Sequence, residues 1–152
     1  MARALPKSNG ELSAPSAFDC AKLGLLPELQ ELVQQDFDVN AYDETSNATL
    51  LHHAAISGKM GVMEFLLGNE ELRAKVNVDA LGGEMNTTPL FWAASHNQIY
   101  AVELLLRHGA DPNFRDELGF TPFLVAIQRC FPITAAYLVA KDSDINQRMQ
   151  GG

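Results

Sequence analysis

The chain has 152 residues, of which 47% are hydrophobic and 20% are charged, so it is long enough to fold as one compact domain. Its net charge of -8 argues against a nucleic-acid interface, which requires Lys and Arg clustered on one face, and against binding to an anionic membrane surface. The longest nearly uncharged stretch, 119–140, is interrupted by Pro122, Arg129 and Pro132, so no direct membrane insertion is expected. Residues 1–15 lack the apolar run of a secretory signal and are expected to form a flexible leader.

The remainder of the chain repeats one pattern at an interval of about 33 residues, which is typical of stacked repeat architectures. A first, weak copy, "FDCAKLGLLPELQELVQQDFDVN", ends at Asn40. The second copy begins at Thr49 and contains additional residues, which we place at about 69–75. The third copy, "TPLFWAASHNQIYAVELLLRHGADPN", begins at Thr88, and the fourth, "TPFLVAIQRCFPITAAYLVAKDSDIN", begins at Thr121.

Each copy predicts two helices followed by an extended loop. The pair Thr88-Pro89 favours the start of a helix, because the hydroxyl can cap it and a proline at the first position gives up no needed N–H. Asn97 suits the positive φ that ends a first helix. Branched residues at helical spacing then predict a second helix, which in the third copy ends at Gly109 before the loop "ADPN". In the fourth copy the matching loop is expected to end at Asn146.

The copies resemble ankyrin repeats, whose consensus reads TPLHxAAxxG followed by LLxxGADxN. The resemblance extends over about 16–146 and implies an all-α solenoid of four helix-turn-helix repeats with protruding hairpin fingers. Such units stack because one helix pair cannot bury its apolar face alone. We therefore expect a single ankyrin-repeat domain over 16–152, with repeats at about 16–43, 44–82, 83–116 and 117–148.

The sequence stops where a further repeat would begin, so the solenoid is expected to continue in a longer protein. Its last repeat would then leave an apolar face exposed, since terminal repeats normally carry a polar outer surface. We expect a monomer that is able to self-associate through this face. The face comprises Leu124, Ile133, Tyr137 and Leu138.

The sequence gives no support for catalysis or metal binding. The two cysteines, Cys20 and Cys130, fall in the first and fourth repeats, too far apart for a disulfide, and are expected to be free thiols. There is no Cys/His spacing typical of zinc, no Ser-His-Asp arrangement and no phosphate-binding loop. We expect no catalytic residue, no metal and no cofactor in this segment.

Positions at which the copies differ are the candidates for recognition. The consensus histidine, present as His52, is replaced by Phe18, Phe91 and Leu124 in the other copies, so Phe91 is expected to pack inside. The following position, Trp92 in the third copy, faces the concave groove in ankyrin folds. Two interpretations stay open for this tryptophan: it packs against the neighbouring helix, or it anchors a bound peptide. The other residues expected to bind a partner are His53, Ser57, His96, Gln128 and Arg129 on the helices, and Tyr42, Leu81, Glu84, Phe114, Arg115 and Asp116 on the fingers.

Two stretches, "DVNAYDETSNATLLHHAA" and "VDALGGEMNTTPLFWAA", are similar to the N-terminal ankyrin domain of Asp-His-His-Cys palmitoyltransferases. The match includes the double glycine at 82–83, whereas His53, Ser57, Gly58 and Phe91 depart from the family pattern. The resemblance implies a cytosolic domain, in a parent protein of the Golgi or another endomembrane, that recruits extended peptide segments of substrate proteins. S-acylation itself would be done by a separate membrane-embedded module. The alternative is a scaffold or regulatory domain of another protein, which binds a folded partner through its finger tips.

Overall fold

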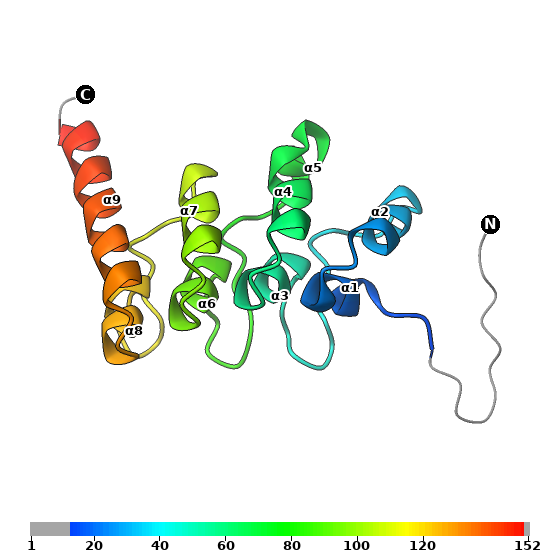
Figure 1. Ribbon diagram of the computed structural model, residues 1–152, viewed down its shortest axis with the longest axis horizontal. Helices are drawn as coiled ribbons and strands as arrows, with labels where there is room; N and C mark the ends of the chain where they lie inside the picture. The colour runs from blue at the N-terminus through cyan, green and yellow to red at the C-terminus, as the bar shows by residue number, and fades with distance from the viewer. Residues whose placement is uncertain (1–12, 151–152) are drawn as a thin grey trace.

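The computed structural model describes residues 13–150, so the leader expected at 1–15 lies almost entirely outside the described range. Helix pairs stand side by side along one axis (Figure 1). Within residues 13–150 there is no β-strand, and the isolated bridge between Gly82 and Thr87 closes one finger loop. The all-α solenoid expected from the sequence is confirmed. Its helices are α1 (Ala17–Leu23), α2 (Leu26–Gln34), α3 (Leu50–Ile56), α4 (Met60–Gly68), α5 (Glu70–Lys75), α6 (Pro89–Ser95), α7 (Ile99–Arg107), α8 (Pro122–Gln128) and α9 (Pro132–Gln150).

The first helix of each pair begins and ends with the same chemistry. A hydroxyl side chain caps each of these helices by accepting a hydrogen bond from a backbone N–H in the first turn. The chain then turns through a residue with positive φ, which favours glycine or asparagine, although Cys130 occupies this position in the last pair. These caps explain why helices of only seven residues begin and end where they do. The capping residues are Ser16, Thr49, Thr88 and Thr121.

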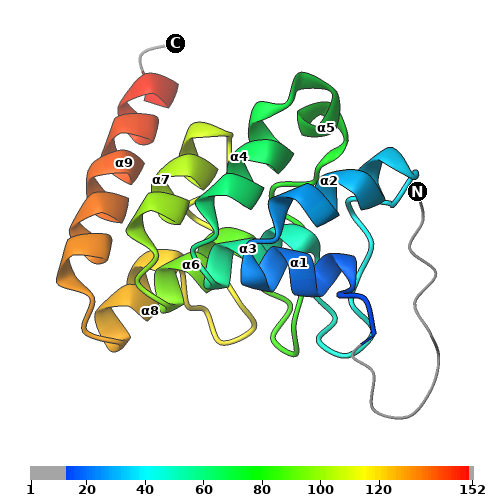
Figure 2. The same ribbon diagram turned by 45° about the vertical axis from the view of Figure 1, so that its right-hand side comes forward.

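The helices form two layers, which the turned view separates clearly (Figure 2). The first helices α1, α3, α6 and α8 pack on one another, and the second helices α4, α7 and α9 cover them. Fully buried alanines of the first layer allow close approach, while buried branched side chains of the second layer fill the space above them. The core therefore runs continuously from one pair to the next. Its members include Ala54, Ala55, Ala93, Ala94, Val62, Leu66, Val102 and Leu105.

The additional residues of the second copy form helix α5. Asn69 caps it, because its side-chain oxygen accepts hydrogen bonds from the backbone N–H groups of Glu71 and Leu72, at 3.0 and 3.2 Å. Leu72 is buried and holds the helix against the core. Asn40, from the preceding repeat, ties the end of α5 with a bond from its amide to the carbonyl of Lys75 at 2.7 Å. The insertion is therefore an ordered element.

The fourth copy differs from the expectation in its second half. Helix α9 continues through Gln150, so the extended loop expected to end at Asn146 does not form. The physical reason is that this copy has neither stop signal of the third copy: Asp142 and Ile145 stand where Gly109 and Pro112 stand.

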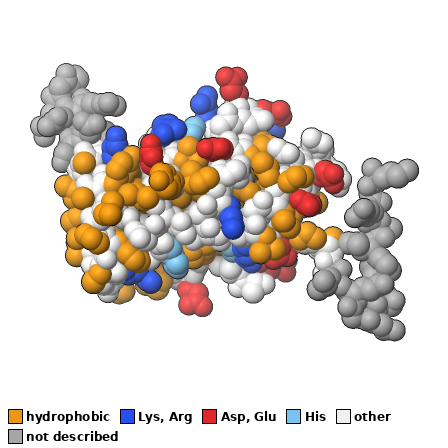
Figure 3. Space-filling model, in the orientation of Figure 1, with side chains coloured by type: hydrophobic (Ala, Val, Ile, Leu, Met, Phe, Trp, Pro, Cys, Tyr) orange, Lys and Arg blue, Asp and Glu red, His pale blue; other side chains and the backbone are white. Residues whose placement is uncertain are grey.

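The C-terminal end of the stack carries a partly exposed apolar face. Figure 3 shows hydrophobic side chains gathered over this end of the molecule. Ile133 is 71% exposed and Leu124 is 40% exposed, as expected for this face, and Tyr137 is partly buried. Leu138, which was expected on the same face, is instead 2% exposed, because it turns inward to the core.

Two further properties concern the thiols and the membrane. Cys20 is buried and Cys130 is exposed, and both are free thiols. Among the described residues, no helix combines the length and the apolar character needed to cross a bilayer.

Candidate peptide-binding surface

Trp92 lies in the middle of α6, the first helix of the third repeat, and its side chain is partly exposed. The indole N–H donates a hydrogen bond to the Oγ1 atom of Thr87 at 2.8 Å. The donor is therefore already satisfied inside the repeat, so the ring offers an incoming partner its apolar surface alone. The ring is neither sealed in the core nor fully solvated, which is the arrangement that an apolar anchor requires.

Two glycines allow the finger backbone to lie against the aromatic rings. A Cβ atom on Gly83 would stand 2.7 Å from the Cζ2 atom of Trp92, and one on Gly82 would stand 2.9 Å from the His52 ring. Gly83 also has φ of 78°, which side-chain-bearing residues rarely adopt. Its backbone N–H donates to the carbonyl of Asn47 in the preceding finger at 2.7 Å. The double glycine therefore fixes the distance between two fingers and the indole.

His52 fastens the second repeat to the third. Its Nε2 atom lies 2.8 Å from the carbonyl oxygen of Thr87, which can only accept, so Nε2 carries the proton and Nδ1 accepts from Thr49. The ring packs edge-to-face on Trp92, with centroids 4.9 Å apart. Complete burial is the main reason that the pKa of His52 falls from 6.5 to about 4. The neutral imidazole therefore joins the second repeat to the third and packs against the indole of Trp92.

His53, which was predicted at the partner-binding surface, is buried in this structure, with only 4% of the residue exposed. Phe18 and Trp92 cover the ring from the two sides, with centroids 6.0 and 6.2 Å away. Its Nε2 atom lies 3.1 Å from Ser46 Oγ and 3.2 Å from Asp43 Oδ2. Burial, followed by the positive charge of Lys22, lowers the pKa of His53. His53 therefore packs against the indole from the neighbouring repeat, and its lowered pKa favours the neutral ring.

Comparison with known proteins supports the repeat assignment. A family model described as "Ankyrin repeats (3 copies)" matches residues 17–116 and 75–149. This chain belongs to the ankyrin-repeat family.

Relatives of this ankyrin chain are palmitoyltransferases. It is 33% identical to ZDHHC13 of Danio rerio over 145 residues, which cover 93% of this chain and 21% of the relative. It is 40% identical to palmitoyltransferase Hip14 of Drosophila melanogaster over 107 residues, and 38% identical to palmitoyltransferase ZDHHC13 of Homo sapiens over 103 residues. Each of these two alignments covers 68% of this chain and 16% of the relative. The ankyrin chain therefore spans about a fifth or less of the length of these relatives.

Some of the other helical residues predicted to bind a partner lie near Trp92 in this ankyrin domain. His96 is exposed on the next turn, and its Nδ1 atom lies 3.2 Å from the Trp92 carbonyl oxygen. Ser57 is partly buried at the end of α3. Gln128 and Arg129 are exposed at the end of α8, and no described hydrogen bond or ring contact joins them to Trp92. The surface around the indole is therefore made chiefly by the second and third repeats.

The finger residues divide into exposed and structural ones. Asp116 is structural, because its Oδ1 atom accepts hydrogen bonds from the backbone N–H groups of Leu118 and Phe120 and thereby shapes its own finger. Phe114 is partly buried. Sequence reasoning missed Met85, which is 41% exposed on the same finger as Leu81 and follows the double glycine. The exposed finger residues that were predicted are Tyr42, Leu81, Glu84 and Arg115.

Acid is expected to destabilise the domain through His52. Between pH 6.5 and about 4 the unfolded chain binds a proton at this ring that the folded chain excludes, so stability falls as the pH is lowered through this window. The full loss is about 3–4 kcal/mol, at about 1.4 kcal/mol for each pH unit between the two pKa values. Urea unfolding at a series of pH values checks this, with His52→Gln as the comparison. A variant that loses stability as steeply as the native chain between pH 6.5 and 4 would contradict the assignment.

Proposed function

We propose that this ankyrin domain is a non-catalytic interaction module that binds extended segments of substrate proteins at Trp92, as the recruiting domain of a palmitoyltransferase. The observation that carries the proposal is the partly exposed indole whose own N–H is already bonded to Thr87. Its relatives bear the name palmitoyltransferase, which supports the larger assignment. The domain would lie in the cytosol, in a parent protein of the Golgi or another endomembrane, and its four repeats would keep the boundaries given above.

Pre-organisation is the physical reason to expect binding at this place. The ring is held by a hydrogen bond, two histidine contacts and a glycine backbone, so little side-chain freedom is lost when a partner covers it. Large aromatic side chains that are fixed in this way are over-represented among the residues that dominate interface energies. An extended segment suits the surface, since it can follow the row of first helices beside the finger loops (Figure 2).

A displayed library of unstructured peptides, selected on the full 152-residue chain, tests the binding part of the proposal. We expect the enriched peptides to share an apolar residue and to displace one another from the chain in fluorescence anisotropy. Selection that yields no family of competing peptides would contradict it. The palmitoyltransferase part is tested separately, by whether the gene continues into membrane spans with an Asp-His-His-Cys segment.

Finger-tip recognition of a folded partner is the second candidate function. The observation in its favour is that Tyr42, Leu81 and Met85 are each more than 40% exposed on finger loops. In that case Leu81→Ser and Met85→Ser would weaken partner binding more than Trp92→Ala. The comparison of these variants on one partner therefore separates the two functions.

A further inference from the structure

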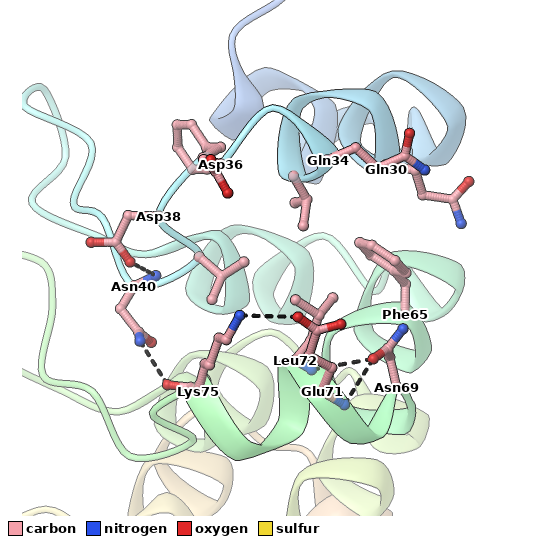
Figure 4. A pocket seen from close by; sticks show the side chains of 13 residues that line it. Gln30, Gln34, Asp36, Asp38, Asn40, Phe65, Asn69, Glu71, Leu72 and Lys75 are labelled. Carbon is pink, nitrogen blue, oxygen red and sulfur yellow. Dashed lines mark hydrogen bonds and ion pairs between the residues drawn. The ribbon is translucent and has the colours of Figure 1, made fainter.

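A second concave feature lies away from Trp92. A cavity of about 870 Å³ opens between α2, the loop at 36–40 and the pair α4 and α5 (Figure 4). Its size is within the range of known ligand pockets, about 300–1,000 Å³. None of the residues around Trp92 lines it. The cavity is therefore independent of the proposed peptide-binding surface.

The insertion in the second repeat creates one wall of this cavity. Asn69, Glu71, Leu72 and Lys75 line it from α5 and its cap, and the third and fourth repeats have no corresponding helix. The wall is held at both ends. The cap of Asn69 fixes its start, and the side chain of Asn40 fixes its end by donating to the Lys75 carbonyl and accepting from the backbone N–H of Asn77. Figure 4 shows the bonds of the Asn69 cap and the bond from Asn40 to Lys75.

Five apolar side chains contribute to the otherwise polar lining of the cavity. Val33 from α2 and Phe65 from α4 both line it and are partly buried against the core. Val39 and Leu72 are each only 7% exposed. Phe37 is held edge-to-face against Phe18, with centroids 5.9 Å apart. A hydrophobic side chain placed here would exchange water for five apolar side chains.

The rim of the cavity is negatively charged. Asp36 and Asp38 are exposed, and neither forms an ion pair with any residue in the described part of the chain. Lys75 is the only cation among the lining residues, and its Nζ atom lies 3.2 Å from the carboxylate of Glu71, so these two charges offset each other. Two uncompensated carboxylates, Asp36 and Asp38, remain beside the five apolar side chains. Such a rim attracts cationic groups and repels phosphates, anionic lipids and acidic segments.

We propose that this cavity, which we name the α2–α5 cavity after the helices that bound it, is a second protein-docking site. It takes a segment in which an apolar side chain is flanked by Lys or Arg. The apolar side chain packs on the apolar lining residues, Val33 and Phe65 among them, and the basic neighbours meet Asp36 and Asp38 at the rim. The site is separate from Trp92, so the proposal is independent of the function proposed above.

The test uses the full chain and a fluorescein-labelled peptide, acetyl-Lys-Lys-Leu-Phe-Lys-Lys-amide, followed by anisotropy. The double variant Asp36→Asn/Asp38→Asn removes the rim charge, while asparagine tolerates the positive φ of 65° at position 36 and can accept the bond that Asp38 receives from Asn40. We expect it to weaken binding about two- to thirtyfold, the range for two exposed charge pairs. The matched control, Glu44→Gln/Glu117→Gln, removes two exposed finger carboxylates and is expected to change nothing.

A second pair of variants tests whether the peptide enters the cavity, independently of the rim charge. Gln34→Trp places an indole at the cavity lip and should abolish binding, whereas Glu31→Trp adds the same ring to an exposed position of α2 that does not line the cavity. Lys75→Gln should strengthen binding, and Trp92→Ala should leave it unchanged.

Four results would overturn the proposal. The first is no binding at millimolar peptide, and the second is equal binding of the charge-reversed peptide acetyl-Glu-Glu-Leu-Phe-Glu-Glu-amide. The third is loss of Lys-peptide binding in the variant Trp92→Ala but not in Gln34→Trp, which would assign the peptide to the surface around Trp92. Binding of an uncharged fatty alcohol in place of the peptide would likewise make the cavity a site for an alkyl chain and reject a protein segment.

Discussion

Replacing Trp92 with alanine is expected to weaken binding of a library-selected peptide by roughly 30- to 1,000-fold, the loss of about 2–4 kcal/mol that is typical of a buried aromatic anchor. The reason is that the indole is the apolar surface available at this position, and it is already held in place by Thr87, His52 and His53. The measurement is calorimetric titration of the peptide into both chains. The fold is expected to persist, because the ring is only partly buried.

Tyr100→Ala is the matched control, since it removes an aromatic ring that is 72% exposed on the outer layer of helices. It should leave the affinity unchanged. If Trp92→Ala binds the peptide as tightly as Tyr100→Ala does, the indole is a packing residue, and the first of the two interpretations open from the sequence would hold. A retained helical circular dichroism spectrum distinguishes lost binding from lost folding.

Replacing Gly83 with alanine is expected to lower the free energy of unfolding by about 2–5 kcal/mol. About 1–2 kcal/mol comes from placing a side chain at positive φ, and about 1–3 kcal/mol from forcing the indole away from a Cβ atom that would stand 2.7 Å from it. Urea unfolding measures the loss. Since Trp92 is the only tryptophan, its fluorescence in the native state reports the displaced ring directly.

Gly109→Ala separates the two contributions. Gly109 has φ of 88°, similar to Gly83, but a Cβ atom there meets nothing within 4 Å. This control should show the backbone cost alone and leave both the fluorescence and the peptide affinity unchanged. Equal destabilisation by the two substitutions would mean that the indole moves aside freely, and the finger would then not fix its position.

The fold could be predicted from the sequence because its signals are local and repeated. Each first helix begins at a hydroxyl residue, as at Thr88 and Thr121, and turns afterwards through a residue suited to positive φ. The loop expected in the second half of the fourth copy was predicted wrongly because the local signals that end a helix are missing there. Without a glycine and a proline where the third copy has Gly109 and Pro112, nothing in the fourth copy stops the helix.

The surface around Trp92 was harder to predict, because burial depends on neighbours that a repeat alignment does not contain. Alignment places His53 at the same position as Trp92, yet Phe18 covers it from one side and the Asp43 finger binds its nitrogen. The α2–α5 cavity was beyond prediction for a related reason. The extra residues could be located at 69–75, but a helix of six residues forms only where a cap such as Asn69 and a buried contact such as Leu72 support it.

Helix α5 has a consequence for how a long partner is aligned on the array. A regular stack looks nearly the same after a shift of one repeat, so a ligand that contacts only shared features could slip along it by one period. The insertion abolishes this translational symmetry on one edge of the second repeat, and the single indole abolishes it on the third. A partner that contacts either α5 or the indole can bind in one register only. Each position of the partner's sequence is then aligned with one particular repeat.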